Sequence, residues 1–202
     1  GNASSNLQGR ALRLDPPETW PEPVDGAVLL GELAEFFARH AHLMPGAAVV
    51  LGIWSVHTHC FERARHTPRL AITSPEKGCD KTTVLDLLLF VCCRPLSAAN
   101  ISTAAMFRTI EAAKPALLVD EADSFLSENE ELRGALNAGH KRGGQVVRCI
   151  GDDAEPRTFG VFAPAALAAI GKLPATIADR SIAVPMRKAT RLERPQPIRR
   201  ST

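Results

Sequence analysis

The chain has 202 residues, of which 45% are hydrophobic and 23% are charged, and its formal net charge is +2 at pH 7. This is enough apolar material for one core of ordinary size, while so balanced a charge gives no general preference for nucleic acid or a membrane surface. No run approaches the roughly 18 apolar residues of a membrane-spanning helix, and five cysteines without C-x-x-C spacing favour reduced thiols in a cytoplasm over a disulfide framework.

The chain begins with a polar tail followed by a helical segment. Residues 1–23 contain four prolines among Asn, Ser and Gly, and they predict a flexible tail or linker. From Asp25, which can serve as an N-cap, apolar residues recur every three or four positions and predict a helix; a second helix is predicted over 47–63. The second helix contains the His-Thr-His-Cys run 57–60. Only the first His and the Cys share a face, so a packed helix end is favoured over a metal site.

A strand–turn–helix pattern follows. A short apolar run at 69–73, a turn that carries Lys81 and Thr82, and a helical run from Val84 form the context of a phosphate-binding P-loop (Walker A motif). In such a loop the backbone N–H groups and the helix N-terminus face the phosphates. Lys81 would reach the β- and γ-phosphates, and the Thr82 hydroxyl would bind Mg²⁺. The residues assigned to nucleotide binding are Gly78, Cys79, Asp80, Lys81, Thr82 and Thr83.

This loop departs from the G-x-x-x-x-G-K-[ST] pattern at both glycines. Pro75 stands at the first and Asp80 at the second, so only Gly78 between them supplies backbone freedom. Asp80 puts a Cβ and a carboxylate where the main chain must approach the phosphates, and we therefore expect weak ATP binding and little hydrolysis. Two alternatives are open: the carboxylate pairs with Lys81 and holds it away from the phosphates, or it rotates to solvent and the loop still closes.

Three further segments lead to an acidic motif. We expect a strand near 95–100, a helix over 103–113 with Ser102 as its N-cap, and a strand over 116–121 that ends in adjacent carboxylates. The alternation of strand and helix from Arg69 onward predicts a parallel sheet with helices on both faces.

The acidic strand has the pattern of the second half of an ATPase site, the Walker B motif. Such a strand is expected beside the P-loop strand, with Asp120 in the Mg²⁺ shell and Glu121 as the residue that activates water; Asp123 is the next candidate for this base. The alternative is a strand that meets a solvated acidic loop. In this order and spacing, the two motifs together predict a P-loop NTPase fold.

A β-hairpin is predicted after a further helix that begins near Glu128. Two runs, 144–150 and 157–162, flank a polar turn in the manner of paired strands. Arg148 and Arg157 on this hairpin would suit contact with the phosphates of a DNA backbone. The alternative is a solvated basic loop, partly balanced by its own acidic residues.

The end of the chain is predicted to complete the sheet and then to leave it. A strand over 165–170, a short helix over 173–179 and a last strand over 181–186 would complete the core. Residues 189–202 are basic and broken by proline, which is typical of a solvated linker, here expected to lead to a further C-terminal region.

These motifs together resemble a bacterial family of P-loop ATPase domains of unknown function, found in phage- and plasmid-type proteins beside primase or helicase modules. The resemblance implies an AAA+-like fold of three α/β/α layers with an inserted hairpin, ATP and Mg²⁺ as cofactors, and assembly into a ring that acts on DNA. It divides the domain at 24–188 into N-terminal helices (24–66) and a core (67–188). The similarity is carried by residues 72–83, 100–102, 118–123, 131–140 and 170–181.

The resemblance also implies a role for Arg180. In AAA+ proteins, an arginine shortly after a Leu-Pro helix start often reaches into the ATP site of the neighbouring subunit, where it stabilises charge on the γ-phosphate. The alternative is an arginine that satisfies a helix C-terminus before the last strand. The strand 165–170 carries no polar sensor at its end, and Lys172 is the candidate for that role.

Three functions are therefore open at the level of sequence. The chain is a working ATPase motor acting on DNA, a nucleotide-binding module that no longer hydrolyses, or a structural P-loop fold that binds only protein partners. Asp80 distinguishes these possibilities, because it bears directly on nucleotide affinity.

Overall fold

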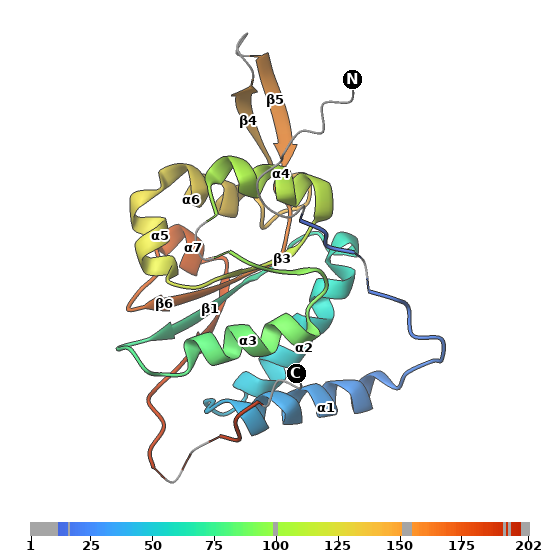
Figure 1. Ribbon diagram of the computed structural model, residues 1–202, viewed down its shortest axis with the longest axis vertical. Helices are drawn as coiled ribbons and strands as arrows, with labels where there is room; N and C mark the ends of the chain where they lie inside the picture. Colours follow the sequence, from blue (N-terminus) through green and yellow to red (C-terminus); the bar gives the residue numbers. More distant parts are fainter. Residues whose placement is uncertain are drawn as a thin grey trace, which may run out of the picture.

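The computed structural model describes residues 12–15, 17–98, 101–150, 155–191, 193 and 195–198. Its centre is a parallel sheet of five strands in the order β2-β3-β6-β1-β7, with helices on both faces (Figure 1). This confirms the predicted α/β class and the parallel sheet. The strands are β1 (Arg69–Ser74), β2 (Pro95–Ser97), β3 (Ala116–Val119), β6 (Ala165–Ile170) and β7 (Ser181–Pro185).

The acidic strand does not lie beside the P-loop strand, and that prediction is wrong. Strand β6 separates them, pairing with β1 on one side and with β3 on the other. Five of the six residues of β6 are fully buried, and four of the six are alanines, so β6 suits a central position with helices packed on both faces. Apolar runs identify buried strands, but they do not specify which buried strands pair.

Each face of the sheet buries its own apolar cluster. Because successive side chains of a strand point to opposite faces, Leu70 and Ile72 of β1 pack on one side and Ala71 on the other. The first side is covered by α1 (Gly26–His40), α2 (Ala47–Cys60) and α3 (Lys81–Val91); the second is covered by α4 (Thr103–Ala113), α5 (Ala122–Glu128), α6 (Glu130–Ala138) and α7 (Ala175–Ala178).

The two N-terminal helices form as expected. The Asp25 carboxylate accepts hydrogen bonds from the first turn of α1, and α2 continues into a short 3-10 turn at Phe61–Arg63. The histidines of α2 have protein partners: His57 Nε2 lies 2.9 Å from the Thr67 hydroxyl, and His59 Nε2 lies 2.9 Å from the Val91 carbonyl. No helix within the described ranges is long and apolar enough to cross a membrane.

The helix predicted to begin near Glu128 is α6, and a further helix, α5, precedes it. Helix α5 begins directly after the acidic strand, and α6 follows after a break at Asn129. Asn129 has an extended backbone, and its side-chain oxygen accepts a hydrogen bond of 2.9 Å from Leu132 N, which caps α6. Helix α5 was not predicted, because its seven residues are too few to show a helical period.

The hairpin is present and projects from the body of the molecule (Figure 1). It consists of β4 (Gln145–Ile150) and β5 (Glu155–Gly160), and its turn lies outside the described residues. Arg148 forms an ion pair of 2.8 Å with Glu131 on α6, and its guanidinium lies 5.0 Å above the ring of Phe107 on α4. Arg157 pairs with Glu155 at 3.0 Å. Both arginines predicted to contact DNA are thus already matched with a carboxylate.

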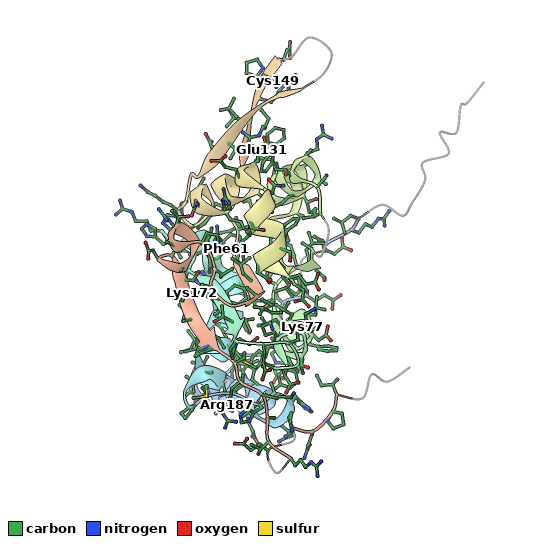
Figure 2. All side chains as sticks on the ribbon, turned by 90° about the vertical axis from the view of Figure 1, so that its left-hand side faces the viewer. Phe61, Lys77, Glu131, Cys149, Lys172 and Arg187 are labelled. Atoms are coloured by element: carbon green, nitrogen blue, oxygen red, sulfur yellow. The ribbon has the colours of Figure 1, made fainter. Side chains whose placement is uncertain are left out.

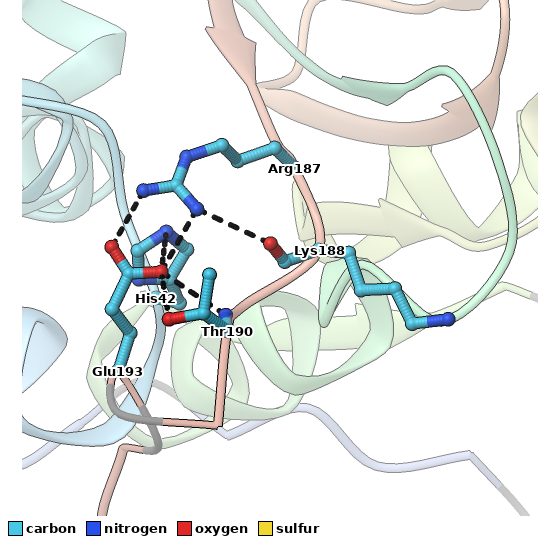
Figure 3. A network of polar contacts seen from close by, with 5 residues as sticks. All are labelled: His42, Arg187, Lys188, Thr190 and Glu193. Carbon is cyan, nitrogen blue, oxygen red and sulfur yellow. Dashed lines mark hydrogen bonds and ion pairs between the residues drawn. The ribbon is translucent and has the colours of Figure 1, made fainter.

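The described part of residues 187–198, which we call the C-terminal strap, lies against the N-terminal helices (Figure 3). Arg187 and Glu193 form a two-pronged ion pair, with Nη2–Oε1 2.7 Å and Nη1–Oε2 3.0 Å. Thr190 donates its N–H and its hydroxyl to the same carboxylate, and His42 Nε2 lies 3.9 Å from it. The hydrogen bonds from Arg187 and Thr190 hold the pKa of Glu193 well below its usual range.

The strap is also tied to the last turn of α1. The backbone N–H of Gln196 donates to the Arg39 carbonyl at 2.9 Å, and the Gln196 carbonyl lies 2.8 Å from His40 Nδ1. The described part of 189–202 thus contacts α1, and Ile198 packs against the core, while most of its residues are exposed. That this segment is a linker to a further C-terminal region stays a prediction.

Candidate phosphate-binding site

The predicted P-loop joins the carboxyl end of β1 to the first turn of α3. Two of its residues have left-handed backbones: Gly78 with φ +75° and Asp80 with φ +56°. Glycine adopts this region without strain, whereas a residue with a Cβ does so at a cost of about 1–2 kcal/mol. Asp80 is the N-cap of α3 and makes no side-chain cap hydrogen bond. The backbone thus has the conformation that a glycine at this position would favour.

The ammonium group of Lys81 is hydrogen-bonded to a serine at the end of β1. Lys81 is only 9% exposed, and its Nζ donates a hydrogen bond of 2.6 Å to the Ser74 hydroxyl. Ser74 in turn donates to the Glu76 carbonyl at 2.7 Å. Of the two alternatives for Asp80, the pairing with Lys81 is not observed between these described residues, because the ammonium group is bonded to Ser74. Lys81 is consequently a buried cation whose hydrogen-bond partner is a neutral hydroxyl.

Thr82 and Asp120 join the two motifs. The Thr82 hydroxyl donates to Asp120 Oδ2 at 2.8 Å, although β6 separates the strands that lead to these residues. The other carboxylate oxygen of Asp120 accepts a hydrogen bond of 2.9 Å from the backbone N–H of Glu121. Asp120 is therefore fixed from two sides, with its carboxylate at the start of the P-loop helix.

The three carboxylates of the acidic motif differ in their partners. Asp120 is bonded as described, and Asp123 Oδ1 accepts a hydrogen bond of 3.1 Å from the Ile170 N–H at the end of β6. The Glu121 side chain is exposed and accepts no hydrogen bond from any described residue. Its backbone is left-handed, with φ +51°, which a non-glycine residue keeps only when its surroundings impose it. Glu121 is the carboxylate that remains free for chemistry.

These residues line one cavity of about 290 Å³. Its lining includes five of the predicted site residues: Gly78, Lys81, Thr82, Asp120 and Glu121. Four predicted residues do not line it: Cys79, which is buried in the core, Thr83, which is half-buried on α3, Asp80 and Arg180. The lining residues not assigned to the nucleotide site from the sequence are Lys77, Asp123, Ser124, Ala168 and Ile170.

The position of one of these lining residues could have been predicted from the sequence. Lys77 directly precedes Gly78 in the loop, so its position beside the phosphates could have been inferred. The two residues from β6 lie at the strand end where the resemblance implied a polar sensor, whereas Lys172, the candidate for that role, does not line the cavity. Figure 2 shows Lys77 between the projecting hairpin with Cys149 and the strap with Arg187, at opposite ends of the molecule.

Arg180 lies at the amino ends of the parallel strands, whereas the cavity lies at their carboxyl ends. Arg180 precedes β7, which runs parallel to β1, and its carbonyl accepts a hydrogen bond of 2.9 Å from Arg69 N at the start of β1. Its guanidinium donates to the Thr176 carbonyl of α7 at 2.5 Å. This is the contact expected of an arginine that satisfies a helix C-terminus, the alternative raised by the sequence. A contact with the cavity of its own chain is excluded by this placement.

A second arginine lies close to Arg180. Arg69 is buried and donates to the carbonyls of Ala163 and Leu136, the latter at 2.6 Å in the last turn of α6. Burial, together with the positive charge of Arg180, lowers the pKa of Arg69 to about 9. The Arg69 guanidinium remains charged at neutral pH and stabilises the end of α6.

The residues of the cavity suit Mg²⁺ only in combination with phosphate oxygens. The described residues contain no group of three or more His, Cys, Asp or Glu side chains able to hold a metal. Mg²⁺ is typically bound by one or two carboxylates together with substrate phosphates and water. Thr82 and Asp120, 2.8 Å apart, supply the hard oxygen ligands for such a shared site.

Comparisons with known proteins identify no family for this chain. No protein-family model matches the chain, and no curated protein matches it. The function must therefore be argued from the cavity itself.

Proposed function

We propose that the cavity binds the phosphates of Mg·ATP and that the chain is a P-loop nucleotide-binding domain with weak hydrolytic activity. The contact that carries this proposal is the 2.8 Å hydrogen bond between Thr82 and Asp120, which brings the two motifs together beside Lys81. A buried ammonium group, a hydroxyl and a carboxylate at the start of a helix are the groups that a triphosphate with its Mg²⁺ requires. The AAA+ assignment and a mobile-element context rest on the resemblance alone.

The residues of this chain have separate tasks in the proposed reaction. Lys81 would leave Ser74 to bind the β- and γ-phosphates, and Thr82 and Asp120 would hold Mg²⁺, whose charge would offset that of the phosphates. Glu121 orients a water molecule and accepts its proton as that water attacks the γ-phosphate. Asp123 keeps Glu121 in place by tying the start of α5 to the end of β6.

The test of this proposal is nucleotide binding in a chain with a repaired loop. Mg·ATP titrated calorimetrically into the Asp80→Gly variant should bind saturably at one site per chain. The double variant Asp80→Gly/Lys81→Met should lose this binding, because the buried cation is removed while the apolar stem is kept. A control is Asp80→Gly/Lys114→Met, in which the changed lysine pairs with Glu62 away from the cavity. Absence of binding to Asp80→Gly would overturn the proposal.

A second function is favoured by the bond between Lys81 and Ser74. This contact satisfies the lysine without nucleotide, and Asp80 places a negative charge in the loop. A structural domain that binds protein partners would need no more than this. The same titration decides between the two functions, because a structural domain would bind no ATP even in the repaired variant.

Assembly into a ring is proposed from the resemblance, and Arg180 provides its test. In the Asp80→Gly background, Arg180→Ala should lower turnover about tenfold, the size of one lost charge-assisted contact, with little change in ATP affinity. Turnover per chain should also rise with protein concentration, since Arg180 cannot reach the cavity of its own chain. Turnover per chain that stays flat over a wide dilution series would contradict a shared site.

Contact with DNA stays a prediction of the resemblance. Arg148 and Arg157 are matched with Glu131 and Glu155, so neither offers the unpaired positive charge that the sequence suggested. The role that the structure gives Arg148 is to fasten the hairpin to α4 and α6.

A further inference from the structure

Two lysines of one loop border the cavity, and they differ in their surroundings. Lys81 is buried and bonded to Ser74. Lys77 is exposed in the turn between β1 and α3, and among the described residues it has no carboxylate partner within ion-pair distance. An exposed ammonium group at the rim of a cavity is free to turn toward a ligand. The next residue, Gly78, has nothing within 4 Å of a Cβ built on it, so the turn has room to adjust.

The net charge of the cavity lining indicates a role for Lys77. The ionisable lining residues are two lysines and three carboxylates, namely Asp120, Glu121 and Asp123, so the lining is negative by one charge. Asp80 adds a further negative charge in the adjoining turn. The negative charge of the site therefore repels a triphosphate, and the positive charges of Mg²⁺ and Lys81 must offset this repulsion. Without Lys77, the repulsion would be greater.

We propose that Lys77 is a second phosphate-binding residue, one that contacts the outer, γ-side oxygens of a nucleoside triphosphate and so favours triphosphate over diphosphate. This inference rests on the proposed function of the same cavity. Lys81 approaches from the foot of the loop and Lys77 from its rim, so the phosphate chain is held between two ammonium groups. The preference follows because a diphosphate lacks the outermost group and carries less charge, and it gains less from the cation at the rim.

The size of the effect follows from the exposure of Lys77. An ion contact in high dielectric contributes modestly, and its removal should weaken Mg·ATP binding by about fivefold to tenfold. Mg·ADP should be weakened by about twofold or less, because the contact lies on the γ-side. The contact should weaken further in salt, since it is exposed to solvent.

The experiment measures Mg·ATP and Mg·ADP affinities by calorimetry. The variants are Lys77→Gln, Lys77→Arg and the matched control Lys141→Gln, and each is made in both the native and the Asp80→Gly chain. Lys141 is also an exposed lysine, but it lies at the amino edge of the sheet, where the neighbouring His140 carbonyl accepts a hydrogen bond from Thr67 N. The expected result is a selective loss for ATP in Lys77→Gln, recovery in Lys77→Arg, and no change in Lys141→Gln. Each Lys77 variant should have the melting temperature of its own parent chain, because Lys77 has no ion-pair partner among the described residues.

Two different outcomes would overturn the inference, and they are distinguishable. Equal ATP affinity in Lys77→Gln and its parent, or an equal loss for ATP and ADP, removes the assignment of Lys77 and leaves the proposed function standing. Absence of saturable ATP binding in both the native and Asp80→Gly chains removes the proposed function and this inference with it.

Discussion

Replacing Asp80 with glycine is expected to raise the Mg·ATP affinity of the chain by about a hundredfold. The carboxylate is attached to the turn whose backbone must approach the phosphates, and a like-charge contact at about 4 Å costs about 4 kcal/mol at an effective dielectric near 20. Screening by salt and by Mg²⁺ reduces this penalty, and every ~1.4 kcal/mol that remains is tenfold in affinity. Calorimetric titration of Mg·ATP into the native and variant chains measures the difference.

The variant Asp80→Asn separates the effect of the Asp80 charge on ATP affinity from the effect of its backbone conformation. Asparagine removes the carboxylate and tolerates the left-handed backbone at φ +56°, so it should recover most of the affinity. Glycine should also stabilise the free chain by about 1 kcal/mol, because it relieves the strain at this position. Equal affinity in the native, Asn and Gly chains would mean that Asp80 turns to solvent and that the loop binds ATP as it stands. The position of Asp80 outside the cavity lining makes this control essential.

Glu121→Gln in the Asp80→Gly background is expected to keep ATP binding and to lower the turnover number by about a hundredfold to ten-thousandfold. Glutamine has the shape of the glutamate but cannot accept the proton of the attacking water. The carboxylate of Glu121 has no hydrogen-bond partner among the described residues, so the substitution breaks no contact that holds the fold. Phosphate release measures turnover, and calorimetry measures binding.

The control for this prediction is Asp123→Asn. Asp123 accepts a hydrogen bond from Ile170 N, and the side-chain oxygen of asparagine can still accept it, so Asp123→Asn should leave the free energy of unfolding nearly unchanged and affect turnover less than Glu121→Gln does. The reverse order, with turnover unchanged in Glu121→Gln and abolished in Asp123→Asn, would move the base to Asp123. The sequence placed Glu121 before Asp123 as the candidate base, and the difference in their hydrogen-bond partners supports that order.

Local signals predicted most of the helices and strands. The helix capped by Ser102 runs over Thr103–Ala113 as expected, and the strand over 165–170 has the predicted bounds. In both, a capping residue or an apolar run marked the element within a few positions of the chain. Lys81, Thr82 and Asp120 meet in space for a related reason, since parallel strands bring their carboxyl ends to one edge of the sheet.

The features that could not be predicted depend on distant pairing. The insertion of β6 between β1 and β3 brings Ala168 and Ile170 to the cavity, and no local pattern in the chain specifies that order. The bond from Lys81 to Ser74 argues against one of the two conformations that the sequence left open, the pairing of Asp80 with Lys81. The C-terminal strap docks through backbone atoms of Gln196, whose hydrogen bonds are independent of its side-chain type, and through the side chain of Ile198, a single apolar residue with no periodic pattern around it.

The position of β1 at the interior of the sheet has a consequence for how the chain acquires its structure. Both neighbours of β1, the strands β6 and β7, are synthesised about a hundred residues after it. Until they emerge, Leu70 and Ile72 and both backbone edges of β1 have no strand to pair with, and the phosphate loop at its end has no fixed base. Closing such long loops is slow, and an unpaired apolar strand is prone to associate with other chains. We therefore expect the cavity at the end of β1 to be among the last parts of this protein to form.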